Sequence, residues 1–114
     1  MFEETNDGIK LSWGSSARSC GDTLDVSCEQ AKAEVTIPAT QLVPGARLLL
    51  TNLRGQFAAS FIDGEGAGCS TGQQTLAGTA EIFSTTPNEI RFRIEGNEFG
   101  TTSVDGYYSA TRCN

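Results

Sequence analysis

The chain has 114 residues, a formal net charge of −6 and no histidine. We expect a single domain over residues 1–114, because this length supports one hydrophobic core. The absence of histidine excludes Ser-His-Asp and Cys-His catalysis, and it excludes zinc, iron or copper sites with histidine ligands. The acidic balance argues against nucleic acid or an anionic membrane surface as the main partner.

Short stretches of alternating apolar and polar residues dominate the chain, and this period of two is typical of half-buried β-strands. In the clearest stretch, residues 89–95, Ile90, Phe92 and Ile94 share one face. In chain order, strands are expected over residues 8–13, 31–37, 47–53, 56–63, 75–85, 89–95 and 104–112.

Turn-forming residues separate these strands. Pro44 and Gly45 predict a tight turn at residues 43–46, because proline fixes φ and glycine accepts a positive φ. A second proline turn is expected at residues 86–89. Residues 63–72 contain four glycines and little to bury, so they are expected to form a loop.

Seven to eight short strands at a spacing of roughly ten residues predict an all-β fold. The expected architecture is an antiparallel β-sandwich or a flattened barrel. One local alternative is a short helical turn within residues 27–34, where Ser27 and Gln30 form a capping box.

The four cysteines favour a disulfide framework in an oxidising compartment, with free thiols or a metal site as alternatives. The sequence has no C-x-x-C pair, which argues against zinc. Our preferred pairing is Cys20–Cys28, which closes a short loop of turn-forming residues, and Cys69–Cys113, which ties the last residues to a mid-chain loop. The two other connectivities remain open.

Paired cysteines imply an exported protein, at an extracellular location or at an outer-membrane or periplasmic surface. Residues 1–4 have neither a basic nor an apolar export signal, so we expect that such a signal has been removed ahead of Met1. The longest apolar run, residues 48–50, is too short to span a membrane. Membrane association is therefore expected only through a lipid anchor. The lack of an Asn-x-Ser/Thr sequon fits a bacterial source.

Several motifs occur in a recognisable order along the chain. They are Leu11-Ser12-Trp13, a close cysteine pair, Val35-Thr36-Ile37-Pro38, Gly68-Cys69 and the closing stretch from Asp105 to Cys113. This order resembles small exported domains of myxobacteria and related bacteria, many of them lipoprotein-like and of uncharacterised function. The resemblance spans most of the chain. It implies export and a β fold, and it transfers no catalytic residues.

Asp63 and Glu65 are the candidate cation ligands, because two carboxylates lie two positions apart in a glycine-rich loop. Such oxygen ligands suit calcium, although the pattern lacks the further ligands of an EF-hand. The alternative is an ordinary surface loop that ends at a disulfide. We expect no other cofactor and no metal site.

Tyr107 and Tyr108 are the candidate ligand-binding aromatic residues. They are adjacent in a predicted strand and must point to opposite faces, so one of them is expected to face outward. Trp13 is in phase with apolar neighbours and is expected in the core. Arg91 and Arg93 share an exposed face, where pairing with acidic residues such as Glu81 is the preferred interpretation.

These observations favour a non-enzymatic, exported or cell-surface module with a binding or structural role. Protein interaction or envelope association is the first hypothesis, with a protein or glycan at the cell surface as partner. A carbohydrate-binding module is the alternative, and a subunit of an extracellular fibre or pilus is third. No carboxylate pair stands out for hydrolysis and both lysines lie on exposed strand positions, so we do not expect an enzyme.

Overall fold

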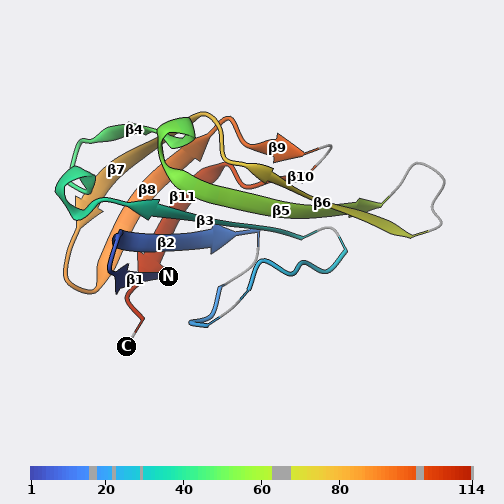
Figure 1. Cartoon of the computed structure of the whole chain (residues 1–114), viewed down its shortest axis with the longest axis horizontal. Coiled ribbons are helices and arrows are strands. Elements are labelled where there is room, and N and C mark those ends of the chain that lie inside the picture. The colour runs from blue at the N-terminus through green and yellow to red at the C-terminus, as the bar shows by residue number, and fades with distance from the viewer. Residues whose placement is uncertain (16–17, 22, 29, 63–67, 100–101, 114) are drawn as a thin grey trace.

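The computed structural model describes residues 1–15, 18–21, 23–28, 30–62, 68–99 and 102–113. Two antiparallel sheets pack face to face as a β-sandwich, which confirms the predicted fold class (Figure 1). The five-stranded sheet has the order β1 (Phe2–Thr5), β2 (Gly8–Gly14), β3 (Ala31–Ile37), β5 (Arg54–Ile62) and β6 (Cys69–Thr75). The four-stranded sheet has the order β11 (Gly106–Thr111), β8 (Glu89–Glu95), β7 (Thr79–Thr85) and β4 (Arg47–Leu49).

The chain crosses between the two sheets several times. After β3 it passes through the 3₁₀ turn η1 (Ala39–Gln41) into β4, and it returns to β5 through a second 3₁₀ turn, η2 (Leu50–Asn52). It crosses again between β6 and β7. A two-stranded ribbon of β9 (Glu98–Phe99) and β10 (Thr102–Ser103) connects β8 to β11.

Alternating residues of both sheets form the core, as the period of two predicts. On β8, Ile90, Phe92 and Ile94 are buried, and on β2 the side chains of Leu11 and Trp13 are buried. Other strands of both sheets contribute further buried side chains: Val35, Ile37, Phe57, Ala59, Ala80, Ile82 and Ala110. The predicted apolar faces of these strands are therefore confirmed.

The turn predictions are also confirmed. The amide of Ala46 donates to the carbonyl of Val43 at 3.1 Å, and Gly45 has a φ of +85°. The amide of Thr86 donates to the carbonyl of Glu89 at 2.8 Å. These bonds close the turn before β4 and the β7–β8 hairpin.

Three boundaries differ from the sequence prediction by more than two residues. The strand expected over residues 47–53 ends after Leu49, because η2 turns the chain toward the other sheet. The loop expected over residues 63–72 already contains the start of β6, and the strand expected over residues 75–85 begins only at Thr79. β6 has no apolar alternation, so its place in the sheet depends on its pairing with β5.

The helical alternative within residues 27–34 is wrong for residues 31–34, which belong to β3, although its capping contact exists. The Gln30 side-chain oxygen accepts a hydrogen bond from the amide of Ser27 at 2.9 Å, and the amide of Gln30 donates to the carbonyl of Ser27 at 3.1 Å. These bonds close one turn, and β3 then starts at Ala31. Pairing of β3 with two neighbouring strands prevails over local helix formation.

The disulfides are Cys20–Cys113 and Cys28–Cys69, so the predicted pairs Cys20–Cys28 and Cys69–Cys113 are wrong. Strand register explains the Cys28–Cys69 disulfide. Ala31 of β3 lies opposite Ala59, which places Cys28 near the end of β5, and there Ile62 lies opposite Cys69. The Cα atoms of Cys28 and Cys69 are 5.6 Å apart. The sheet, not proximity in sequence, selects the partner.

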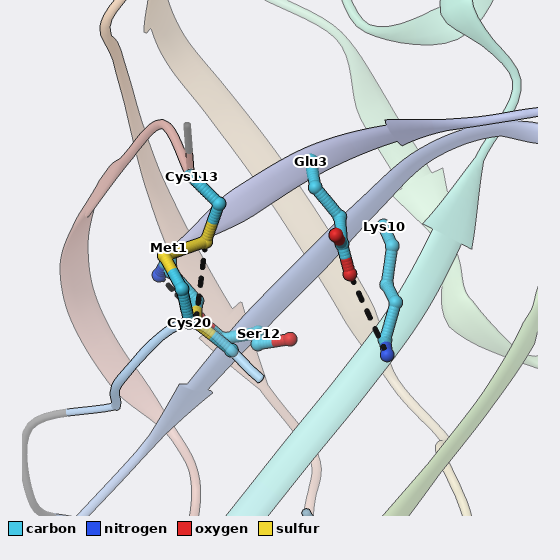
Figure 2. The surroundings of a disulfide bond; sticks show 6 residues. All are labelled: Met1, Glu3, Lys10, Ser12, Cys20 and Cys113. Carbon is cyan, nitrogen blue, oxygen red and sulfur yellow. Dashed lines mark hydrogen bonds and ion pairs between the residues drawn. A yellow bond between two sulfur atoms is a disulfide. The ribbon is translucent and has the colours of Figure 1, made fainter. Parts of the chain in front are cut away.

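The other disulfide lies where the two sheets meet at the chain ends (Figure 2). Phe2 forms a parallel bridge with Arg112, and the amide of Cys113 donates to the carbonyl of Phe2 at 2.8 Å. The chain end that leaves the four-stranded sheet is thereby joined to β1 of the five-stranded sheet. Cys20 reaches Cys113 at this seam, with 5.7 Å between their Cα atoms.

The two disulfides indicate an oxidising, non-cytoplasmic location. Among the described residues, no helix has the length and apolar character needed to cross a membrane.

Candidate binding face

The outer surface of the four-stranded sheet carries exposed aromatic and charged side chains. We call this surface the aromatic face. It consists of Arg47, Leu49, Glu81, Phe83, Glu89, Arg91, Arg93, Glu95 and Tyr107. Strand register builds it, because residues that alternate with the core positions of each strand must point outward.

One row of this face runs across all four strands. Tyr107 lies opposite Arg93, Arg93 lies opposite Glu81, and Glu81 lies opposite Arg47. Residues directly opposite each other on one sheet face are close enough for their side chains to interact. The row therefore brings an aromatic ring, two guanidinium groups and a carboxylate onto one continuous surface.

Two aromatic rings are among the exposed apolar groups of this face, together with Leu49. Tyr107 is 72% exposed and Phe83 is 44% exposed. Their rings stack with centroids 5.8 Å apart and an interplanar angle of 13°. The register between β7 and β8 shifts between Ile82 and Ser84, which makes Phe83 the inserted residue of a bulge. The bulge thereby sets the position of the Phe83 ring beside Tyr107.

Ion pairs hold the arginines in place. Arg93 contacts Glu81 at 3.5 Å and Glu95 at 3.2 Å, and Arg47 contacts the other oxygen of Glu81 at 3.5 Å. The predicted pairing of Arg93 with Glu81 is confirmed. The Arg93 guanidinium carbon also lies 5.9 Å from the centre of the Tyr107 ring, in the range of a cation–π contact.

These contacts shift the pKa of one basic and one acidic side chain of the face. The pKa of Arg93 is raised, first by a side-chain hydrogen bond with Tyr107 and then by the negative charge of Glu95. The pKa of Glu89 is lowered by a hydrogen bond from Ser109 and by its contact with Arg91, where the two side chains are 2.8 Å apart. Both shifts favour the charged forms of Arg93 and Glu89.

The aromatic face has no net charge, because its three arginines balance its three glutamates. The whole charge of −6 is carried by the rest of the chain. Both lysines, Lys10 and Lys32, lie on β2 and β3 of the other sheet. The face is thus neutral, aromatic and rich in arginine on an otherwise acidic protein.

Tyr107 and Tyr108 point in opposite directions, as their adjacency requires. Tyr108 is half-buried and packs against Phe92, with ring centroids 5.5 Å apart. Burial, and then the negative charge of Asp105, raise the pKa of Tyr108. Trp13 is buried, as expected. Of the two candidate tyrosines, Tyr107 is therefore the one that faces solvent.

Phe83, Arg47 and Leu49 were not among the predicted site residues. A signal for Phe83 exists in the sequence, since Ala80 and Ile82 face the core and an aromatic residue in the opposite phase must face outward. Its contact with Tyr107 depends on strand order, which β7 alone does not reveal.

Asp63 and Glu65, the predicted calcium ligands, lie outside the described residues. Within the described ranges, no group of three or more His, Cys, Asp or Glu side chains is placed to hold a metal ion. The calcium hypothesis is therefore untested.

Hollows occur elsewhere on the surface. One of about 560 Å³ lies on the outer side of the five-stranded sheet, and Lys10, Glu34 and Arg54 are among its lining residues. Lys10 contacts Glu34 at 3.5 Å and Glu3 at 3.8 Å, and Figure 2 shows the second pair. The single ammonium of Lys10 thus contacts two carboxylates at the hollow.

Comparisons of the chain with protein-family models, with curated proteins and with solved structures found no match. A functional assignment therefore depends on the geometry of the molecule itself.

Proposed function

We propose that this chain is a non-enzymatic binding module that recognises a protein partner through the aromatic face. The observation that carries the proposal is the stacked pair of Tyr107 and Phe83, exposed beside a neutral set of ion-paired arginines. Protein interfaces are enriched in aromatic residues and arginine and are depleted in lysine. Tyrosine and arginine are also over-represented among the residues that contribute most to binding energy.

The fixed geometry of this face supports a binding role. The ion pairs and the stack hold its side chains in place before any partner arrives, so less side-chain entropy is lost on association. The acidic remainder of the chain keeps the protein soluble and disfavours contacts elsewhere on its surface.

The electrostatics of the face support the absence of catalysis. A general acid needs a raised carboxyl pKa near the operating pH. Glu89 has a lowered pKa, and Glu81 and Glu95 are both held by Arg93. These carboxylates suit ion pairing rather than proton transfer.

We place the module outside the cytoplasm, as an exported protein of the bacterial periplasm, outer membrane or cell surface. The oxidising compartment supports this location, and so does the resemblance to small exported domains of myxobacteria and related bacteria. In such a setting, a lipid anchor or a larger parent protein would hold the module at the envelope.

A carbohydrate ligand is the second candidate for the same face. It is favoured by the outward Tyr107 ring, which lies beside the polar groups of Arg93 and Glu81. An exposed aromatic ring can stack on a sugar, and neighbouring planar polar groups can bond its hydroxyls. The protein partner remains the preferred proposal because two aromatic rings and three arginines share the surface.

The test compares binding by three forms of the oxidised, folded protein. Immobilised wild-type protein is exposed to solubilised envelope proteins of the producing cells, and the affinity of each retained protein is measured after purification. We expect the double variant Tyr107→Ala/Phe83→Ala to bind at least about tenfold more weakly. The control is Gln56→Ala/Asn6→Ala, which changes exposed side chains of β5 and of the β1–β2 turn and should leave the affinity unchanged.

The outcomes separate the two candidates. Equal affinity of the Tyr107→Ala/Phe83→Ala variant and the wild-type protein would exclude the aromatic face as the binding surface. A glycan array probed with the same three proteins tests the alternative. If the wild-type protein binds a glycan, the Tyr107→Ala/Phe83→Ala variant does not, and no protein partner is retained, the carbohydrate-binding function would replace our proposal.

A further inference from the structure

The edge strand β6 has features that most exposed sheet edges lack. It pairs with β5 over seven consecutive residues without a register shift, from Cys69 to Thr75. Its sequence, CSTGQQT, contains no charged residue and no proline. All of its residues are exposed except the partly exposed Gly72. A long, regular, uncharged edge presents unpaired backbone groups that can accept another strand.

Two other edges of the sandwich, β4 and β1, are protected. β4 has only three residues and is followed directly by the turn η2. β1 carries Glu3 and Glu4, and Arg112 and Cys113 bond to its first residue. β11 is one residue shorter than β6, and Arg112, which follows β11, forms the bridge with Phe2 of β1. Natural proteins use short strands, charged side chains and coverage to prevent edge pairing. β6 has seven residues and carries no charged side chain.

The β6 edge is also held in position. The Cys28–Cys69 disulfide ties the start of β6 to the segment before β3. The amide of Ser60, on β5, donates to the carbonyl of Gln30 at 2.9 Å. In Figure 1 the end of β5 and the start of β6 extend beyond the rest of the sandwich. β5 supplies the backbone partners along one edge of β6.

We infer that β6 pairs with β6 of a second copy of this chain, antiparallel, around a two-fold axis at Gly72. This register aligns all seven residues of both strands and joins the two five-stranded sheets into one continuous sheet. It places Thr71 opposite Gln73 of the second copy. Gly72, the smallest residue, lies at the axis where the two backbones meet.

The chemistry of the edge selects a second copy as the occupant. Ser70 and Gln74 lie on one face of β6, and Thr71 and Gln73 lie on the other. Both faces are polar, so an added strand should be polar and uncharged on both of its faces. β6 is itself such a strand. Its lack of charge also removes the repulsion that two chains of net charge −6 would otherwise meet at the contact.

The pairing closes at two copies, because each chain uses its single β6 edge and the pair is two-fold symmetric. The aromatic face lies on the other sheet and remains free in each copy. A dimer therefore presents two aromatic faces, and it would bind a multivalent partner more tightly than a monomer does. This inference does not depend on the proposed function and can fail separately from it.

The test is a charge swap at the two facing positions. Sedimentation equilibrium should show a monomer–dimer equilibrium for the wild-type protein, weak enough to need concentrations up to about 1 mM because a strand edge is a small interface. Thr71→Lys/Gln73→Lys places lysines opposite lysines, and Thr71→Glu/Gln73→Glu places glutamates opposite glutamates. Each variant alone should remain monomeric. An equimolar mixture should recover the dimer, because lysine then faces glutamate.

The control variant Gln41→Lys/Thr51→Lys adds the same charges at exposed positions outside β6 and should dimerise like the wild type. Amide hydrogen exchange in β6 should slow as wild-type protein concentration rises. Thr71 also bonds the Ser60 hydroxyl at 3.3 Å, so unfolding curves check that each variant is folded. A wild-type protein that stays monomeric at about 1 mM overturns the inference. So does a mixture that fails to recover the dimer, or a lysine variant that dimerises alone.

Discussion

Trp13 and Tyr108 donate hydrogen bonds to the same backbone carbonyl oxygen, that of Val104, from opposite sheets of the sandwich. The Trp13 indole nitrogen lies 3.0 Å from this oxygen, and the Tyr108 hydroxyl lies 2.8 Å from it. The rings of Trp13 and Tyr108 are 6.3 Å apart, and both pack on Phe92. Val104 itself is fully buried. The segment between β10 and β11 is therefore fastened to both sheets at one point.

The Tyr108 hydroxyl should stabilise the fold in a pH-dependent way. Tyr108→Phe is expected to lower the free energy of unfolding by about 1–2 kcal/mol at neutral pH, because a partly buried hydrogen bond is lost. The folded-state pKa of Tyr108 lies above its ordinary value of 10.0, so the folded protein holds this proton more tightly than the unfolded chain. The contribution is complete below pH 10.0 and is lost as the pH rises through the folded-state pKa.

Urea unfolding of both proteins at a series of pH values measures this effect. The difference between wild type and Tyr108→Phe should narrow above pH 10.0. Tyr107→Phe is the control, since its exposed ring should change stability by less than about 0.5 kcal/mol. A Tyr108→Phe difference that stays constant or widens with rising pH would contradict the assignment.

Asn97 acts as an internal hydrogen-bonding bridge. It is buried, and its side chain accepts from the amide of Ala77 and donates to the carbonyl of Ala77, both at 2.7 Å. Asn97→Ala leaves both backbone groups without their partner, so we expect a loss of about 2–4 kcal/mol in the free energy of unfolding. Asn52→Ala, at an exposed position, should have little effect. A small change in the free energy of unfolding for Asn97→Ala would mean that water replaces the Asn97 side-chain amide.

Gly78 and Gly45 both have a positive φ, of +69° and +85°, and they differ in the space around them. A Cβ at Gly78 would overlap the carbonyl oxygen of Glu95, whereas nothing lies within 4 Å of a Cβ at Gly45. Gly45→Ala should therefore cost about 1–2 kcal/mol from the backbone conformation alone. Gly78→Ala should cost about 3 kcal/mol or more, because the overlap adds to that cost. If denaturant unfolding shows that Gly45→Ala and Gly78→Ala lower the free energy of unfolding equally, this expectation is contradicted.

The two disulfides make a prediction for peptide mapping and for local stability. Proteolysis without reduction should release the peptide of Cys20 joined to that of Cys113, and the peptide of Cys28 joined to that of Cys69. Removing Cys28 and Cys69 as a pair of alanines should cost about 4 kcal/mol through the closed loop of 41 residues. Hydrogen exchange should accelerate most in β6 and at the end of β5. Acceleration centred on β1 would instead point to different pairing.

Local periodicity accounts for much of what could be predicted from the sequence. Ile90, Phe92 and Ile94 show the core-facing side of β8 by their spacing alone, and Pro44 and Gly45 mark their turn. The span of residues 31–37 matches β3 at both ends. These features depend on backbone geometry within one strand or turn, so neighbouring residues are enough to reveal them.

The candidate face could be predicted only in part from the sequence. Adjacency required that Tyr107 and Tyr108 point to opposite sides, but it did not show which of them faces solvent. That depends on Ala110, two residues beyond Tyr108 and on the same side of β11, which is buried against the facing sheet. The stack with Phe83 also needs the strand order, since β8 lies between the two rings' strands.

The sequence by itself determined that this chain is an all-β protein with alternating apolar faces, proline and glycine turns and an even set of cysteines. The tertiary structure alone decided that β6 exists, which cysteines are bonded and which side chains share the aromatic face. The reason is physical. Alternation is a property of one strand, whereas each of these features depends on which distant strand supplies the hydrogen bonds at a given register.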